Sequence, residues 1–292
     1  MPELPEVEVT RRQIAPLLVG RTIRNVVTTA PSYFFLTSPA RLRDRLRGRS
    51  VRRLERLGKY LLARLDSGEW LLLHLGMTGQ LFGAGAASVR LLASTRGAAL
   101  APERQLDRFR PDAHTHLRLV FADGGPDVLF RDARKFGKVQ LLADGERSPR
   151  LERLGADALK ATGAELYAAS RRRRVPVKTL LLDQSVLAGV GNIYADEALF
   201  LSRVRPLRPA HRLSRAECGR LARALVQVLR RSIATGGSSI SDYVRPDGTD
   251  GAYQDERRVY GRSGEPCHRC RAPIRRVVIG QRSSHYCPRC QR

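Results

Sequence analysis

The first residues of the chain, MPELPEVE, place a proline at position 2 and a glutamate at position 3. A small second residue such as Pro2 permits removal of the initiator methionine, and the new terminus would then be a secondary amine. An amine beside a carboxylate is a nucleophile beside an acid, which is one form of covalent catalysis. Pro5, Glu6 and Glu8 have a simpler explanation as the opening of a helix. Pro2 and Glu3 precede that helix, so they form the candidate catalytic pair.

A second candidate site lies near the other end of the sequence, where Cys267 and Cys270 are followed, after sixteen residues, by Cys287 and Cys290. Two such pairs of thiolates can surround one tetrahedral zinc ion, and the spacing fits a zinc ribbon. Disulfides are the alternative, but no secretion signal accompanies the cysteines and a reducing cytosol disfavours disulfides. We therefore predict one structural Zn²⁺, with no coordination position open for catalysis.

The formal net charge of the chain is +25 at pH 7, and 42% of its 292 residues are hydrophobic. Such a chain can build packed cores, and its charge calls for a polyanionic partner. An arginine-rich genome is the alternative explanation, but exchanging lysine for arginine creates no net charge. Nucleic acid is therefore favoured over a membrane surface or an acidic protein. Without an apolar span or a signal peptide, the chain is expected to be soluble and intracellular.

Hydrophobic periodicity predicts the elements that position these sites. A first helix is expected from about Pro5 to Leu18. Up to residue 148 there follow short apolar or alternating segments, typical of antiparallel strands in a sandwich or barrel: TIRNVVTT, SVRRLERL, KYLLARL, EWLLLHL, HLRLVF, PDVLFRD and KVQLLA. Residues 83–113 interrupt the pattern with Gly, Ala and Arg and are predicted to be a mobile insertion.

From residue 149 the pattern becomes helical. Ser214 and Glu217 form a capping box for a helix that should end near Gly236. The segment VKTLLLDQSVLAGVGNIYADEALF predicts two helices joined by a tight turn, with Asn192 as the cap of the second helix. Exposed N–H groups at such a helix start bind anions, here a DNA phosphate. The predicted domains are therefore 1–148, 149–262 and 263–292.

Two predicted turns carry side chains suited to a DNA duplex. Met77 lies in HLGMTG (74–79), and Arg134 and Phe136 lie in RDARKFG (131–137). Side chains of these types can enter a duplex, unstack a base and fill the vacancy. Each of them taken singly is also explained by ordinary core or surface packing.

Together these motifs resemble the bacterial formamidopyrimidine-DNA glycosylase family, the base-excision enzymes for oxidised purines. The similarity runs in order along the chain through these motifs: PELPEVE, GKYLL, HLGMTG, the Arg-x-Phe loop, LLLDQ…GVGNIYADEALF, the GGSS loop, YGRSGEPC and QR…YCPRCQ. The resemblance implies an α+β fold. It consists of an N-terminal antiparallel β-sandwich with flanking helices, a helix–two-turns–helix domain and a four-cysteine zinc finger.

The resemblance also implies roles for single residues. Processed Pro2 would attack C1′ of the damaged nucleotide, Glu3 would act as acid and base, and Glu6 would hold the active site together. Lys59 would engage a phosphate near the lesion. A loop at 237–256 would close over the flipped base. The implied DNA-contacting side chains are His74, Met77, Arg134, Lys135, Phe136, Lys178, Asn192, Tyr243 and Arg282.

Within this set, Arg134 would pair with the orphaned cytosine, while Asn192 and Arg282 would bind phosphates. The implied activity is that of a bifunctional DNA glycosylase and AP lyase. It would remove 8-oxoguanine and formamidopyrimidines through a Schiff base on Pro2, followed by β,δ-elimination. The implied partner is double-stranded DNA with oxidised bases or abasic sites, bound by a monomer in the bacterial cytoplasm at the nucleoid.

Two alternatives remain open at this point. One is an endonuclease VIII-like glycosylase for oxidised pyrimidines, although PELPE and the Met77, Arg134 and Phe136 set favour the purine branch. The other is a non-catalytic protein that senses DNA damage on the same scaffold. The chain also departs from the family pattern, because Ala133 stands where members usually have proline. The loop that follows therefore lacks the φ restraint that a proline would impose.

Overall fold

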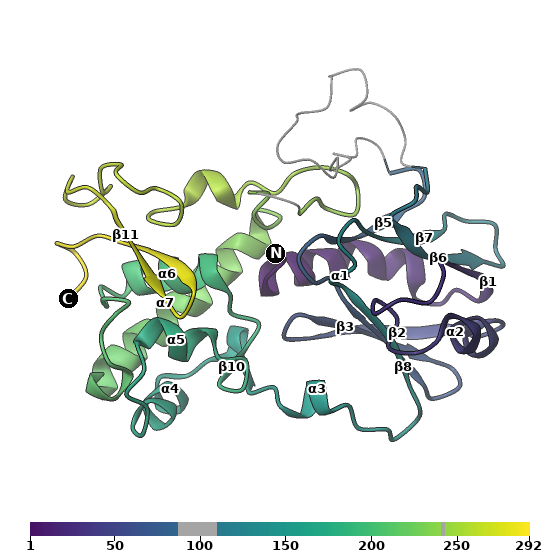
Figure 1. Cartoon of the computed structure of the whole chain (residues 1–292), viewed down its shortest axis with the longest axis horizontal. Coiled ribbons are helices and arrows are strands. Elements are labelled where there is room, and N and C mark those ends of the chain that lie inside the picture. Colours follow the sequence, from purple (N-terminus) through teal and green to yellow (C-terminus); the bar gives the residue numbers. More distant parts are fainter. Residues whose placement is uncertain (87–109, 241–242) are drawn as a thin grey trace, which may run out of the picture. The chain divides into compact units, whose positions relative to one another are not determined.

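The computed structural model describes residues 1–86, 110–240 and 243–292 (Figure 1). These residues form two compact units, of which the first comprises Met1–Ser148 and Thr235–Ala252. The second unit comprises Pro149–Ala234 and Tyr253–Arg292. The loop that sequence analysis assigned to the helical domain therefore lies mostly with the first unit. Residues 87–109, the centre of the predicted insertion, lie outside the described residues, and so does the prediction of their mobility.

Two four-stranded antiparallel sheets form the first unit (Figure 1). The first sheet has the strand order β1 (Ile23–Thr28), β6 (Thr115–Phe121), β7 (Val128–Asp132) and β5 (Gly79–Gly83). The second sheet has the strand order β2 (Val51–Leu57), β3 (Tyr60–Leu65), β4 (Trp70–His74) and β8 (Lys138–Leu142). Apolar side chains of both sheets share one core, which confirms the predicted β-sandwich.

Helix α1 (Leu4–Leu18) contacts strands of both sheets. Its buried face includes Val7, Ile14 and Leu18, which belong to the sandwich core. The spacing of these residues is that of one helical face, so burial of this face holds the N-terminal end of the chain against the sandwich. The sequence predicted this helix to within one residue at its start.

Helix α2 (Pro39–Leu46) and strand β5 were not predicted. In α2 the two core residues Leu42 and Leu46 stand one turn apart among arginines, which hid the apolar face. All five residues of β5 are buried, so the strand shows no alternation of apolar and polar residues. The remaining seven strands of the sandwich correspond to the seven predicted segments.

The second unit is mainly helical. Its helices are α3 (Pro149–Glu152), α4 (Gly163–Ser170), α5 (Val177–Leu182), α6 (Asn192–Leu201) and α7 (Arg215–Ala234). The short strands β9 (Ala156–Asp157) and β10 (Leu187–Ala188) form a parallel pair, and β11 (Arg275–Ile279) forms an antiparallel hairpin with β12 (Arg282–Tyr286). The predicted capping box is present, because Ser214 N–H donates to Glu217 and Glu217 N–H donates to the Ser214 hydroxyl.

Within the described residues, no helix is both long enough and apolar enough to cross a membrane.

A buried carboxylate on α1 links this helix to the second sheet. Glu8 accepts hydrogen bonds from Arg11 and Arg12 of its own helix and from Arg56 of β2. Burial raises the pKa of Glu8, but the hydrogen bonds and charges of the arginines outweigh burial and lower the pKa to about 2. The ionised form is therefore the one that the folded state stabilises.

We predict that Glu8→Gln lowers the free energy of unfolding at pH 7 by up to about 3 kcal/mol. The pKa is depressed on folding, so this contribution is fully present above the ordinary pKa of 4.5 and is lost as the pH falls towards about 2. Urea unfolding of both proteins from pH 7 to pH 2 measures the difference.

The control is Glu55→Gln, because Glu55 forms an exposed ion pair with Arg53. Such surface pairs contribute little, so this variant should unfold like the wild type. If the loss of unfolding free energy caused by Glu8→Gln did not shrink towards low pH, the lowered pKa of Glu8 would be contradicted.

Candidate active site and nucleic-acid interface

The N-terminal end of α1 is fixed by one buried carboxylate. Glu3 is the N-cap of the helix and forms a capping box with Glu6. The backbone N–H of Glu3 donates to Glu6 Oε2 at 2.9 Å, and the other oxygen, Oε1, accepts from the backbone N–H of Ser238 at 2.9 Å. Pro2, Glu3 and Glu6 are all buried, whereas Met1 is exposed. Glu6 thus joins the candidate catalytic pair to the GGSS loop.

The GGSS loop approaches Glu6 closely because it contains glycine. Gly237 has φ +85°, and a Cβ there would lie 3.0 Å from the ring of Tyr243 and 3.1 Å from Glu6 Oε1. Tyr243 is itself buried, and burial together with the charge of Glu6 raises the pKa of its phenol, so the hydroxyl stays protonated. Tyr243, which belongs to the loop predicted to cover the flipped base, and the Glu6 carboxylate that fixes Glu3 therefore both lie close to Gly237.

Lys59 and His74 lie on the second sheet of the sandwich. Lys59 follows Gly58 in the two-residue turn between β2 and β3, and it is only partly exposed. His74 ends β4, where its ring lies 4.7 Å from that of Tyr60 and its Nδ1 accepts from the N–H of Gly76. Nδ1 is therefore the unprotonated nitrogen of the neutral ring.

The structure brings Met77, Arg134 and Phe136 onto two adjoining turns. The β4–β5 turn carries Met77, and the β7–β8 turn carries the other two residues. A Cβ on Gly76 would lie 2.5 Å from backbone atoms of both Phe136 and Gly137, so the two turns touch. Met77, Arg134 and Phe136 are exposed, while Gly76, Thr78 and Gly137 beside them are buried. Two apolar side chains and one arginine therefore project into solvent from a rigid base.

Asp132 is the anchor of this base. Its carboxylate accepts from the backbone N–H of Arg134 at 3.2 Å and of Gly137 at 2.6 Å, and it also accepts from the hydroxyl of Thr78 in the neighbouring turn. Lys135, between these two N–H groups, has φ +57°. Asp132 is completely buried, and sequence analysis missed it. Its position at the end of a strand, next to the exposed loop, was the signal that could have identified it.

Tyr33 is a further residue that sequence analysis missed. Its side chain is 60% exposed, its hydroxyl donates to the carbonyl of Arg134 at 2.7 Å, and its ring lies 4.9 Å from Lys138 Nζ. A second support, besides Asp132, thus reaches the loop that carries Arg134 and Phe136. No sequence pattern links Tyr33 to a loop about a hundred residues later.

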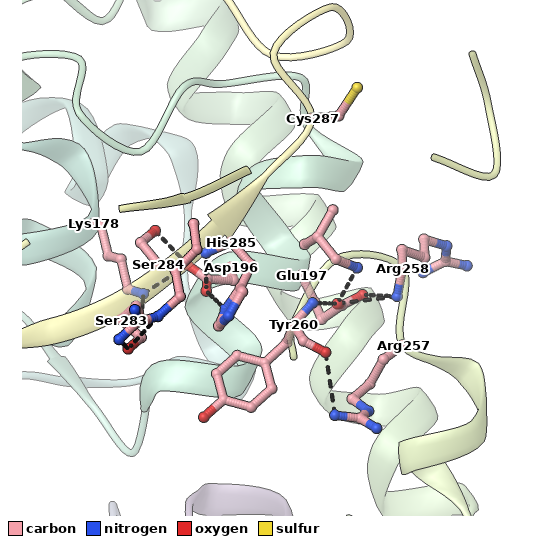
Figure 2. A network of polar contacts seen from close by, with 12 residues as sticks. Lys178, Asp196, Glu197, Arg257, Arg258, Tyr260, Ser283, Ser284, His285 and Cys287 are labelled. Carbon is pink, nitrogen blue, oxygen red and sulfur yellow. Dashed lines mark hydrogen bonds and ion pairs between the residues drawn. The ribbon is translucent and has the colours of Figure 1, made fainter. Parts of the chain in front are cut away.

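Lys178, another member of the implied DNA-contacting set, lies on α5 of the second unit. Its side chain is 0% exposed, its Nζ lies 2.7 Å from Asp196 Oδ1, and it donates to the carbonyl of Ser283 (Figure 2). The ammonium is thus paired with a carboxylate that is itself 0% exposed. In this structure Lys178 joins α5 to Asp196 of α6 and to Ser283 of β12, and its contact with DNA stays a prediction.

Asn192 and Arg282 are both accessible in part. Asn192 is the first residue of α6 and Gly191 is its N-cap, so the prediction that Asn192 itself caps the helix is wrong by one position. The carbonyl of Gly191 already accepts the first helical bond, from Ala195 N–H. The Asn192 Oδ1 has no hydrogen-bond partner among the described residues. Arg282 is exposed at the start of β12.

The four cysteines are gathered at the base of the β11–β12 hairpin. Their Sγ atoms all lie within 4.8 Å of one another, with Cys267 and Cys290 at 4.0 Å and Cys270 and Cys287 at 3.4 Å. Tetrahedral zinc with Zn–S bonds of about 2.3 Å separates its sulfurs by about 3.8 Å. The backbone N–H groups of Arg269 and Cys290 donate to these sulfurs, as suits thiolates. The donor set therefore fits one structural zinc ion.

Comparisons with known proteins agree with this arrangement. Family models match at residues 1–139 (formamidopyrimidine-DNA glycosylase N-terminal domain), 154–244 (its H2TH domain) and 264–292 (zinc finger found in FPG and IleRS). The formamidopyrimidine-DNA glycosylase of Geobacter metallireducens is 44% identical over 294 residues, with complete coverage of both chains. The chain belongs to the formamidopyrimidine-DNA glycosylase family. This confirms the resemblance inferred from the motifs.

Solved structures of this family have the same fold. The MutM (FPG) protein from Thermus thermophilus superposes with a TM-score of 0.82 at 38% identity, covering 99% of this chain and 98% of that chain. A mutant Lactococcus lactis FPG in complex with a Fapy-dG containing DNA gives a TM-score of 0.85 at 30% identity, with both chains fully covered. These likenesses confirm the predicted α+β fold of this chain, with its H2TH domain and zinc finger.

We predict that Gly76→Ala lowers the free energy of unfolding by about 2 kcal/mol or more, because it adds a backbone clash to the cost of a positive φ. Gly48→Ala is the matched control, since Gly48 also has positive φ but a Cβ there meets nothing within 4 Å. Urea unfolding compares the two variants, and equal losses would show that the two turns do not touch.

We predict that stripping the zinc with a chelator unfolds the β11–β12 hairpin, because so small a module draws its folding free energy from the metal. The affinity for an abasic-site duplex should fall when the hairpin unfolds, and it should return when zinc is added back. Unchanged affinity in metal-free protein would exclude the zinc finger from the DNA interface.

Proposed function

We propose that this protein is a DNA glycosylase of base excision repair that also cleaves the DNA strand at the excised site. Its substrate would be double-stranded DNA containing oxidised purines, namely 8-oxoguanine and formamidopyrimidines. Membership of the formamidopyrimidine-DNA glycosylase family and the likeness to structures solved with Fapy-dG or abasic-site DNA support this proposal. The net charge of +25 favours a polyanionic substrate.

The observation that carries the proposal is the buried start of α1. Glu6 fixes the backbone of Glu3 through a hydrogen bond of 2.9 Å, and Pro2 is therefore held next to a carboxylate at a defined point of the fold. A secondary amine in this position needs no strong shift of its pKa, because free α-amino groups titrate at about 7.7–8.0. An arginine could not take this role at neutral pH.

The chemistry follows from an amine next to an acid. The nitrogen of processed Pro2 adds to C1′ of the damaged nucleotide, the base leaves, and Glu3 transfers the proton that opens the sugar. The resulting iminium ties the protein to the DNA and acidifies the 2′ proton. Loss of this proton expels the 3′ phosphate, and a second elimination expels the 5′ phosphate. Hydrolysis then releases the protein.

The other candidate residues would bind and open the duplex. Met77 and Phe136 would fill the space left by the flipped nucleotide, and Arg134 would pair with the orphaned cytosine. Lys59, His74 and Lys135 would contact the DNA near the lesion. Asn192 and Arg282 would bind phosphates from the second unit, and Tyr243 belongs to the loop that would cover the extruded base.

We propose that the protein works as a monomer, because one chain supplies every residue that the mechanism requires. The relatives named above are bacterial proteins, and the proposed substrate is chromosomal DNA. The proposed location is therefore the bacterial cytoplasm, at the nucleoid. The zinc ion would be held by the four cysteines, where it stabilises the hairpin that carries Arg282.

Borohydride trapping tests the proposal. With a duplex containing 8-oxoguanine opposite cytosine, the wild-type protein should give a covalent adduct. Blocking the amine of Pro2 should abolish the adduct, and Glu3→Gln should slow base excision by about 100-fold or more, because a general acid typically contributes that much. Denaturing gel electrophoresis measures both effects.

Glu55→Gln serves as the control, because Glu55 is an exposed glutamate of the same unit. It should leave trapping unchanged. Tight binding of the lesion duplex without any adduct would support a non-catalytic damage sensor. Preferential trapping on an oxidised pyrimidine would support the endonuclease VIII-like alternative.

A further inference from the structure

Helix α6 contains two adjacent acidic residues, Asp196 and Glu197, that the proposed chemistry does not use. Both side chains are completely buried, and the residues of α6 that follow them, Ala198–Leu201, are all apolar. A buried charge is costly unless it is paired and hydrogen-bonded. The partners of these two carboxylates therefore show what the acidic pair does.

Asp196 connects three elements of the second unit (Figure 2). Its Oδ1 pairs with Lys178 Nζ of α5 at 2.7 Å and accepts from the Ser284 hydroxyl of β12 at 2.9 Å. Its Oδ2 accepts from the backbone N–H of His285 at 2.8 Å. Lys178 also bonds to β12 directly, because its Nζ donates to the carbonyl of Ser283 at 2.7 Å. The ion pair thus holds the second strand of the zinc hairpin against two helices.

Glu197 holds the segment that leads into the zinc finger. Its Oε1 accepts from the backbone N–H groups of Arg258, Val259 and Tyr260 at 2.9–3.0 Å. Three successive N–H groups that converge on one carboxylate form an anion-binding nest. Two adjacent residues of α6 therefore bond to the zinc-finger region: Glu197 to the segment that precedes it, and Asp196 to its second strand, β12 (Figure 2).

The same two elements carry the proposed phosphate-binding residues. Asn192 lies four residues before Asp196, which is about one helical turn along α6. Arg282 lies two residues before Ser284, and side chains two apart on a strand share one face. Since Ser284 points at Asp196, Arg282 projects from the face of the hairpin that is turned towards α6. Any shift of β12 against α6 would move Arg282 relative to Asn192.

We propose that Asp196 is a positioning residue, which sets the distance between Arg282 and Asn192 and so lets both bind the same stretch of DNA backbone. The proposal rests on the proposed function of these two residues as phosphate binders. Zinc folds the hairpin, whereas the Asp196–Lys178 pair orients it. The two tasks are separable, because none of the Asp196 contacts involves a zinc ligand.

The test uses Ser284→Ala, which removes one hydrogen bond to Asp196 and leaves the ion pair intact. Asp196→Asn is less suitable as the first variant, because it leaves a buried Lys178 without its counter-charge. The matched control is Ser283→Ala on the same hairpin, since the Ser283 hydroxyl bonds to Arg276 and not to Asp196. The probe is a duplex containing a tetrahydrofuran abasic analogue, titrated at several salt concentrations.

Ser284→Ala should retain one zinc per chain and bind the probe about 5-fold more weakly, while Ser283→Ala should bind within about 2-fold of the wild type. Arg282→Ala should reduce the salt slope by about 0.9, the value for one phosphate contact. In the Arg282→Ala background, Ser284→Ala should cost no further affinity, because Asp196 acts through Arg282. The double variant Lys178→Met/Asp196→Asn should likewise weaken binding of the probe when Arg282 is present and cost no further affinity in the Arg282→Ala background.

If the affinity losses of Ser284→Ala and Arg282→Ala multiplied in the double variant, the proposal would be overturned. Equal affinity losses in Ser284→Ala and Ser283→Ala would also overturn it. Loss of zinc from Ser284→Ala would also overturn it, because folding and orientation would then be one task. If Arg282→Ala alone leaves affinity and salt slope unchanged, the phosphate role of Arg282 in the proposed function fails as well. The binding assay needs no turnover, so it is independent of the trapping result.

Discussion

The carboxylate of Glu6 accepts one hydrogen bond from the backbone of Glu3 and another from the backbone of Ser238, and its side chain is buried. Glu6 therefore couples the start of α1 to a loop more than two hundred residues later in the chain. Both bonds need α1 to begin where it does and Gly237 to keep a positive φ. Every step of the proposed chemistry depends on this contact, because it fixes the reacting amine next to Glu3.

Other buried carboxylates of the molecule also accept hydrogen bonds from backbone N–H groups of loops. Asp132 accepts backbone N–H groups of the Arg134–Phe136 turn, and Glu197 accepts three N–H groups ahead of the zinc finger. In a chain with so many arginines, these buried acids bond to backbone rather than pair with surface cations. A carboxylate that holds several N–H groups fixes the path of a loop.

The sequence predicted those parts of the structure that depend on local pattern. Apolar periodicity located α1 and seven strands, and the Ser214–Glu217 capping box located α7, because these signals arise within a few residues. The spacing of the four cysteines predicted the zinc site in the same way. The ion pair of Lys178 with Asp196 was not predicted, because the two residues are not neighbours in the sequence. Tyr33 and Asp132 were missed for the same reason, since the contacts that give them a role form only in the folded chain.

The central claim is that the amine of Pro2 is the group that bonds to the DNA. Mass spectrometry of peptides from the borohydride-trapped complex of natively produced protein tests it most directly. The account predicts an N-terminal peptide that lacks Met1 and carries the sugar remnant on Pro2. An adduct on another residue such as Lys59, or an active protein in which Met1 is still attached, would contradict it.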